Sequence, residues 1–375
     1  MFSAAEKEAR HKAIRSIMID QGLKALLFVG DTNVGPSFCG DLRYYSNNRL
    51  VFYRQVVVAF PDADPVLFAW SEVQRMAALK VSFISDCRLG EDLLAAAIKL
   101  LRERGITTGR VGISLDAVSA AWYKQLVAEF PEVEWVEAHD HIMKLRVQRS
   151  PEEAEMFRRG ALLGDGGFEA ALKVIRPGVT EYEIVAEIEH FARAHGAEEH
   201  FSLIGTVKFP FEGLDRFPMS CPSNKRVEAG ELVLMEITPR YEGYWTQIVR
   251  VVNVGAPNPV AEKIHKVCVE AIRKGLEEFK PGKRISDVVK AMDSYVSSTG
   301  YLLKPPLGHI CGVDLLEDRV SPKNDMVLTP GTMVVIHPAI FLPDGKSNFF
   351  WGETYLVTQD GYERLHKTGD ELHNA

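Results

Sequence analysis

The spacing of apolar positions predicts an N-terminal segment in which helices alternate with short strands. Residues 4–21 repeat apolar positions with the period of an amphipathic helix, which ends at Gly22, and Glu91–Arg104 also has a helical pattern. Ala25–Val29 is an apolar run of the length typical of a buried strand, and Arg110–Ser114 also has the pattern of a strand. Alternating strands and helices over about 140 residues predict one α/β domain.

The pattern changes near residue 146, where a long helix is expected to begin. Ser150 followed by Pro151 is a strong start signal, because serine caps a helix and proline suits its first turn. We therefore expect two domains, at residues 1–146 and 147–375.

The second domain is expected to combine helices with antiparallel strands. Two strong strands, Leu232–Thr238 and Tyr244–Val252, surround a turn at residues 240–243. Two helices are expected next, at Val260–Phe279 and Ile285–Thr299, and then two further strands, at Met333–His337 and Thr354–Thr358. Such runs of strands and helices predict an α+β fold.

Composition and charge narrow the classes of function. A net charge of −7 lacks the basic footprint of a nucleic-acid-binding protein. No apolar stretch is long enough to span a bilayer, and the charged N-terminus lacks the pattern of a signal peptide, so we expect no membrane partner. Five scattered cysteines suit a reducing compartment, so we expect a cytoplasmic protein.

Several segments resemble, in the same order, those of the prolidase, aminopeptidase P and creatinase family. They are Asp41–Tyr45, Lys144–Pro151, Pro177–Glu183, Asn224–Glu231, Gly308-His309, Thr329–Met333 and the strand that ends at Leu356–Thr358. The resemblance covers nearly the whole chain. It implies a creatinase-like α/β N-terminal domain and a C-terminal α+β catalytic domain with the pita-bread fold.

The resemblance also locates the metal-ligand positions of the family's peptidases. Those peptidases hold two divalent ions with two aspartates, one histidine and two glutamates. The corresponding residues here are Glu236, Gln247, His309, His337 and either Gly352 or Glu353. Only His309 keeps the family's residue type, and an amide offers one neutral oxygen where a bridging carboxylate offers two charged ones. We therefore expect no two-metal centre.

The family's proton-shuttling histidines are replaced as well, by Met219 and Leu316. Since the metal-free creatinases keep the earlier of these histidines, the chain matches neither the peptidase pattern nor the creatinase pattern.

Each candidate residue also has a purely structural interpretation. Glu236 lies in an apolar run, where a carboxylate is costly unless paired or protonated, and a salt bridge with Arg240 or Arg250 would explain it. His309 and His337 could be ordinary core histidines. We favour a functional role for all three because they fall on the ligand positions of one site.

Four further residues are candidates for substrate binding. Gln247 could bind substrate through its amide or only fill a vacated ligand position. Glu353 could hold a substrate cation, and Tyr244 could form a pocket wall or pack in the core. Arg54 could hold a carboxylate, since a guanidinium suits that bidentate task, or it could be a solvated charge.

Three hypotheses follow from these residues. The first is a creatinase-like hydrolase, or a lyase, that acts without a cofactor on a C–N bond of a small amino-acid-derived or carboxylated substrate. His337 or His309 would be the general base, with Glu236 orienting it and raising its pKa. The second is a metal-dependent Xaa-Pro aminopeptidase or dipeptidase with one divalent transition metal at Glu236, His309 and His337. The third is a non-catalytic binding module.

The resemblance finally predicts the assembly. Relatives with a short N-terminal domain commonly form homodimers, so light scattering should give about twice the chain mass of 41.9 kDa. A clean monomer at micromolar concentration would contradict this prediction.

Overall fold

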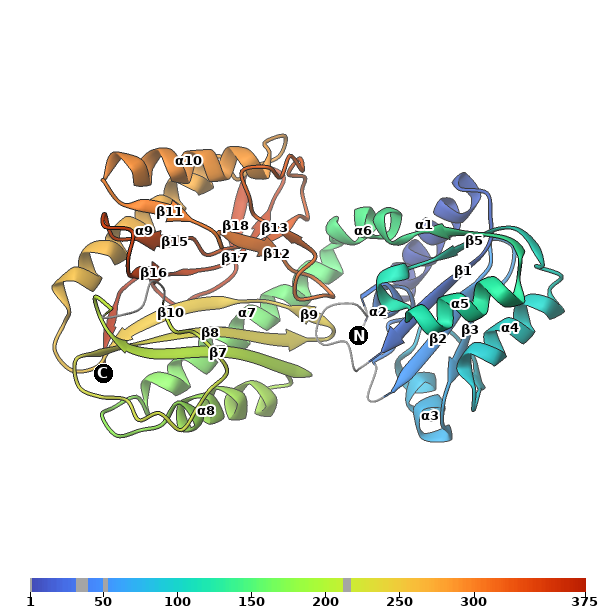
Figure 1. The fold of residues 1–375 in the computed structure, drawn as a ribbon, viewed down its shortest axis with the longest axis horizontal. Coiled ribbons are helices and arrows are strands. Elements are labelled where there is room, and N and C mark those ends of the chain that lie inside the picture. Colours follow the sequence, from blue (N-terminus) through green and yellow to red (C-terminus); the bar gives the residue numbers. More distant parts are fainter. Residues whose placement is uncertain (1, 32–39, 50–52, 212–216) are drawn as a thin grey trace. The chain divides into compact units, whose positions relative to one another are not determined.

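The computed structural model describes the chain except for residues 1, 32–39, 50–52 and 212–216, and it divides into two compact units (Figure 1). Unit 1 comprises Met1–Val147 and Val313–Leu315, and unit 2 comprises Gln148–Gly312 and Leu316–Ala375.

Unit 1 is built on a six-stranded mixed sheet with the strand order β4-β3-β2-β1-β5-β6. Its strands are β1 (Leu23–Asp31), β2 (Arg54–Ala59), β3 (Val66–Ala69), β4 (Asp86–Leu89), β5 (Thr108–Ile113) and β6 (Glu132–Glu137). Its α-helices are α1 (Ala4–Asp20), α2 (Gly40–Ser46), α3 (Glu72–Val81), α4 (Leu93–Glu103), α5 (Ala120–Glu129) and α6 (His139–Val147).

Helices cover both faces of this sheet because successive strand residues point to opposite faces. Leu27 and Val58 belong to the core that includes α4 and α5. Leu26 and Val57 are the preceding residues on the same two paired strands, and they belong to a different core. That second core includes residues of α1, α2, α3 and α6. The predicted α/β domain is confirmed.

Unit 2 contains four α-helices within the described residues: α7 (Pro151–Leu172), α8 (Glu181–Ala194), α9 (Pro259–Glu277) and α10 (Ile285–Ser298). The sequence predicts where α7 and α8 begin, because each start has a reciprocal capping box. Ser150 and Glu153 form the first box, and Thr180 and Glu183 form the second.

The main sheet of unit 2 has the strand order β13-β12-β14-β17-β10-β8-β7, with three short strands attached to it. Its strands are β7 (Glu199–Lys208), β8 (Glu231–Tyr241), β9 (Tyr244–Trp245), β10 (Ile248–Asn253), β12 (Gly308–Ile310), β13 (Asp318–Arg319), β14 (Met333–Ile336), β17 (Gly352–Val357), β18 (Tyr362–Arg364) and β19 (His373–Asn374). A separate three-stranded sheet consists of β11 (Leu302–Lys304), β15 (Ala339–Phe341) and β16 (Asn348–Phe350).

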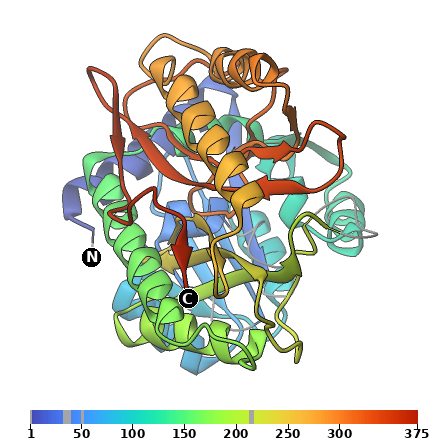
Figure 2. The ribbon, with the colours of Figure 1, turned by 90° about the vertical axis from the view of Figure 1, so that its left-hand side faces the viewer.

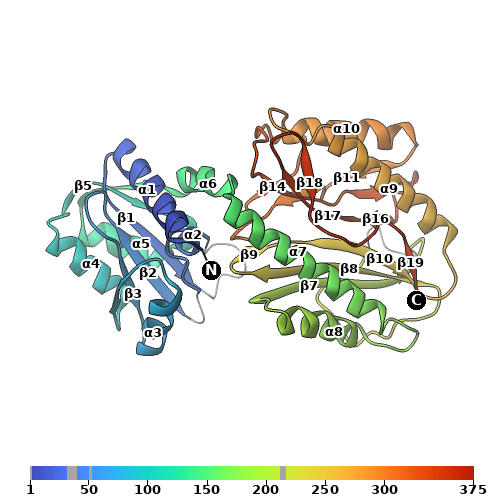
Figure 3. The same cartoon turned by 180° about the vertical axis from the view of Figure 1, so that it is seen from behind.

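Helices pack on both sides of the strands β8 and β10, which are buried along almost their whole length (Figures 2 and 3). Val233 and Ile248 pack with α7 and α8, whereas Leu234 and Val249 pack with α9 and α10. This arrangement confirms the predicted α+β fold. In the part of the chain that the structure describes, no helix has the length and apolar character needed to cross a membrane.

One predicted strand is interrupted. The sequence Tyr244–Val252 is uniformly strand-forming, but the structure divides it into β9 and β10, with Thr246 and Gln247 between them. The break falls on one of the residues that the resemblance assigns to the site.

Candidate functional site

Strand β8 places the carboxyl group of Glu236 inside the protein. Leu234 and Glu236 are two residues apart on β8, so their side chains leave the same face of the strand. Leu234 packs in the core with α9 and α10, and Glu236 is only 8% exposed. Among the described residues Glu236 has no ion pair, because Arg240 pairs with Glu199 and Arg250 pairs with Glu353. The salt-bridge interpretation of Glu236 is therefore wrong.

The backbone of Gln247 is fixed by the hydroxyl group of Thr354. The Gln247 N–H donates to Thr354 Oγ1 at 2.9 Å, and the same hydroxyl donates to the Gln247 carbonyl at 3.0 Å. The backbone of Gln247 therefore bonds to the Thr354 side chain of β17 and not to the β17 backbone. This replacement of the backbone hydrogen bonds explains the gap between β9 and β10.

The side chain of Gln247 links Glu236 to His309. Its Nε2 donates to Glu236 Oε1 at 2.6 Å and to Thr238 Oγ1 at 3.1 Å. Its Oε1 lies 3.1 Å from Nε2 of His309, and since an amide oxygen only accepts, that imidazole nitrogen carries the proton. We call Glu236, Thr238, Gln247, His309 and His337 the Gln247 cluster.

The two histidines come from neighbouring strands. His309 lies on β12 opposite Val335 of β14, and His337 directly follows β14. Their rings contact each other edge-on, with centroids 5.3 Å apart, and the His337 ring also packs on Phe350. The two histidines therefore lie in contact, as expected from their assignment to one site.

Burial sets the protonation of the cluster. Burial raises the pKa of Glu236 to about 7, although the hydrogen bond from Gln247 works in the opposite direction. Burial lowers the pKa of His337 to about 3, and the neighbouring His309 adds to that effect. Glu236 was expected to raise the pKa of His309 or His337, and for His337 this is wrong, because Glu236 contacts the Gln247 amide instead.

The residues present do not fit a two-metal centre. The bridging position is an amide that already lies between Glu236 and His309. Outside the gaps at 1, 32–39, 50–52 and 212–216, no group of three or more His, Cys, Asp or Glu side chains is arranged to hold a metal ion. At Gly352, a Cβ atom would lie 2.5 Å from Cα and 2.7 Å from Cβ of His337, so a longer side chain would displace that histidine.

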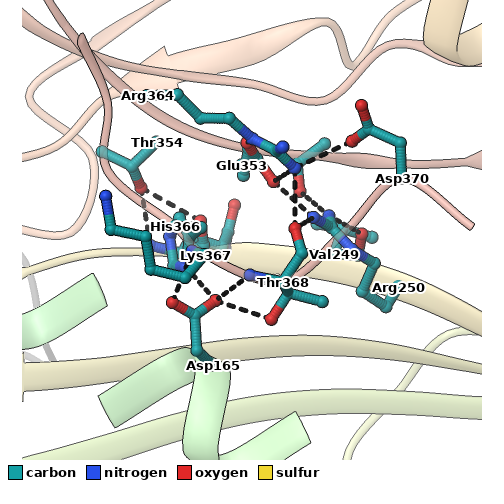
Figure 4. Close-up of polar contacts among 12 residues, drawn as sticks. Asp165, Val249, Arg250, Glu353, Thr354, Arg364, His366, Lys367, Thr368 and Asp370 are labelled. Atoms are coloured by element: carbon teal, nitrogen blue, oxygen red, sulfur yellow. Dashed lines mark hydrogen bonds and ion pairs between the residues drawn. The ribbon is translucent and has the colours of Figure 1, made fainter. Parts of the chain in front are cut away.

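Glu353 lies outside the Gln247 cluster. Figure 4 shows its carboxylate between Arg250 and Arg364, and both arginines form ion pairs with it. Burial alone would raise the pKa of Glu353, but the two arginines and the nearby His366 lower it overall. The carboxylate that was expected to hold a substrate cation is therefore paired with two arginines of the protein itself.

The other two candidates for substrate binding, Tyr244 and Arg54, also contact protein side chains outside the Gln247 cluster. The Tyr244 hydroxyl donates to Glu153 at 2.8 Å, and the Tyr244 ring packs on Phe157. In unit 1, Arg54 Nε lies 2.5 Å from Asp31, and the guanidinium stacks over the ring of Trp122.

The two replaced shuttle positions behave as ordinary packing or surface residues. Met219 is partly buried against the core of α9 and α10, and Leu316 is 44% exposed.

Two residues of the site were not predicted. Thr238 is two positions after Glu236 on β8, and this period of two places both side chains on one face of the strand. Thr354 had no local signal, because its partner Gln247 is 107 residues away in the sequence.

Two family models match the chain. The model of metallopeptidase family M24 matches residues 155–359, and the model of the creatinase/prolidase N-terminal domain matches residues 10–148.

Individual proteins are similar over much of the chain. An Xaa-Pro dipeptidase from Pyrococcus horikoshii is 29% identical over 253 residues, which cover 66% of this chain and 69% of the relative. An uncharacterized Bacillus subtilis peptidase, YqhT, is 25% identical, with 96% and 98% covered. The structure of an X-Pro aminopeptidase from Thermotoga maritima has a TM-score of 0.85 at 20% identity, with 97% and 99% covered. A prolidase structure from P. horikoshii has a TM-score of 0.84 at 24% identity, also with 97% and 99% covered.

The buried carboxyl group of Glu236 predicts a pH-dependent stability. The pKa of this group is about 7 in the folded protein and ordinarily 4.5, so its contribution to stability is fully present below pH 4.5 and is lost as pH rises through 7. Between pH 5 and pH 8, wild type should therefore lose about 2 kcal/mol more unfolding free energy than Glu236→Gln. Urea denaturation of both proteins at both pH values measures this difference. Parallel pH profiles would show that Glu236 ionises in the folded protein as it does in water.

Proposed function

Because the chain belongs to metallopeptidase family M24, we propose that it is a hydrolase of small peptides or amides of the Xaa-Pro dipeptide type. Its relatives support this substrate class, since they include an Xaa-Pro dipeptidase, an X-Pro aminopeptidase and a prolidase. These relatives favour the peptidase hypothesis over the creatinase-like one.

The observation that carries the proposal is the buried chain of hydrogen bonds from Glu236 through Gln247 to His309. By the resemblance, these three residues correspond to metal-ligand positions of the family's peptidases. A carboxyl group that is held by one directed hydrogen bond can exchange a proton with a reacting group beside it.

We assign the acid–base role to Glu236. In hydrolysis, its carboxylate would take a proton from the attacking water as the water oxygen bonds to the carbonyl carbon. The same proton would then pass to the leaving nitrogen as the C–N bond breaks. His309 donates its Nε2 proton to Gln247 and so orients the amide that holds Glu236. His337 is a poor base at neutral pH, given its lowered pKa.

A metal ion supplies the attacking hydroxide in two-metal peptidases. We derive no step through an ion here, because the Gln247 amide separates the two side chains that would bind it. The mononuclear form of the peptidase hypothesis therefore requires that this amide move.

A second candidate is ligand binding without turnover. The replacement of two ligand positions by Gln247 and Gly352 favours it, since these changes remove two of the charged groups on which metal-assisted hydrolysis depends.

Turnover of Xaa-Pro dipeptides tests the proposed function. We expect EDTA-treated wild type to release proline from Ala-Pro or Leu-Pro, and Glu236→Gln to lower kcat by about 10²- to 10⁴-fold. His337→Gln should lower kcat by less than about 10-fold, because its imidazole is a weak base. Proline release and circular dichroism are measured for each variant.

The matched control is Glu231→Gln, which makes the same substitution on β8 at a residue paired with Lys225. It should keep wild-type turnover. If wild type binds a dipeptide but hydrolyses none, with or without Mn²⁺, the chain is a binding module. If His337→Gln loses as much activity as Glu236→Gln, the assignment of the acid–base residue is wrong.

A further inference from the structure

The amide of Gln247 uses most of its hydrogen-bonding capacity within the cluster. Both of its N–H groups donate, one to Glu236 and one to Thr238, and its oxygen accepts from His309. Only 1% of the residue is exposed, and Thr354 holds its backbone. A vacated ligand position would leave buried polar atoms without partners, whereas this amide is satisfied.

These bonds occupy one oxygen of Glu236 and the nitrogen of His309 with which a metal ion would be bound. Glu236 Oε1 already accepts from the amide, and Nε2 of His309 already carries a proton that it donates to the amide. A metal-bound imidazole nitrogen must be deprotonated, and a metal-bound carboxylate must present a lone pair to the ion. Glu236 keeps a second carboxylate oxygen, but an ion at this place would have to break the buried hydrogen bond from His309 to the amide before it gained that nitrogen as a ligand.

The glycine at position 352 adds a steric constraint. A Cβ atom there would lie within 2.7 Å of both Cα and Cβ of His337, so a carboxylate can return to this position only if the histidine moves. Position 247 has no such obstacle, because aspartate is smaller than the glutamine that it would replace.

We infer that the hydrogen-bonded amide of Gln247 prevents divalent metal ions from binding at this site. We also infer that one substitution, Gln247→Asp, creates a binding site for a single ion. Aspartate at 247 cannot donate to Glu236, and it supplies a charged oxygen between Glu236 and His309. Two carboxylates and an imidazole suit Mn²⁺, Co²⁺ or Zn²⁺. The inference concerns the same residues as the proposed function and rests on that placement of the site. Its test measures ion binding and not turnover, so either can fail alone.

The test compares Gln247→Asp with Gln247→Asn. Aspartate and asparagine have the same shape, so this pair isolates the charge of the new oxygen from the shortened side chain. Chelator-treated full-length protein is titrated calorimetrically with Mn²⁺ and, separately, with Co²⁺, whose visible absorption reports its coordination. We expect Gln247→Asp to bind about one ion, roughly 10- to 100-fold more tightly than wild type or Gln247→Asn. Adding Glu236→Gln to Gln247→Asp should remove that site.

Two results of the titration would overturn the inference. One is wild type binding an ion at this site as tightly as Gln247→Asp does. The other is Gln247→Asp and Gln247→Asn, both folded by circular dichroism, binding with equal affinity.

A second measurement uses wild type alone and does not depend on the variants folding. Long-range ¹⁵N NMR of His309 should show a protonated Nε2 that is unchanged by excess Zn²⁺. A Zn²⁺-dependent loss of that proton would contradict the inference that Gln247 prevents metal binding.

Discussion

A single buried amide links three strands of the main sheet of unit 2. Gln247 is held at its backbone by Thr354 on β17 and at its side chain by groups on β8 and β12. Three strands of one sheet therefore meet at this residue. Because the amide both donates and accepts, it can join a carboxyl group to an imidazole without any ion between them. A carboxylate at the same position would repel Glu236 unless a cation separated the two.

The strands around Gln247 are fixed by a second polar network, which Figure 4 shows. Arg250, three residues after Gln247, donates to the Gly352 carbonyl at 2.9 Å and pairs with the neighbouring Glu353. Arg364 pairs with Glu353 and with Asp370. This network joins β10 to β17 at the point where Gly352 packs against His337.

The same network holds the chain after β18 against helix α7. Asp165 on α7 accepts hydrogen bonds from the backbone N–H groups of Lys367 and Thr368 and from the Thr368 hydroxyl. Burial raises the pKa of Asp165, but the neighbouring His366 and these hydrogen bonds lower it overall, to about 2. The carboxylate therefore stays ionised at neutral pH and keeps this segment in place.

Local sequence signals predicted most of the fold, because they act over short distances. Ser150 and Thr180 mark two helix starts through contacts with residues three positions away, and the apolar run around Glu236 predicts the buried strand β8. The resemblance to the family also located Glu236, His309 and His337, which the structure brings together with Gln247.

What the sequence could not predict depends on tertiary contacts. The break at Gln247 arises from Thr354, 107 residues away, and no local pattern at Tyr244–Val252 signals it. The partners of Glu353 depend on which way its side chain leaves β17, and one residue of register decides between the cluster and the arginines. The weak basicity of His337 follows from its burial, which the sequence around it does not reveal.

By the resemblance, the hydrogen-bonded amide of Gln247 stands where the family's peptidases hold two ions. Anomalous diffraction from wild-type crystals grown with excess Mn²⁺ shows directly whether ions bind there. We expect density for the Gln247 amide between Glu236 and His309, with no anomalous peak beside them. Two Mn²⁺ peaks in contact with Glu236, His309 and His337, with the Gln247 side chain displaced, would contradict it.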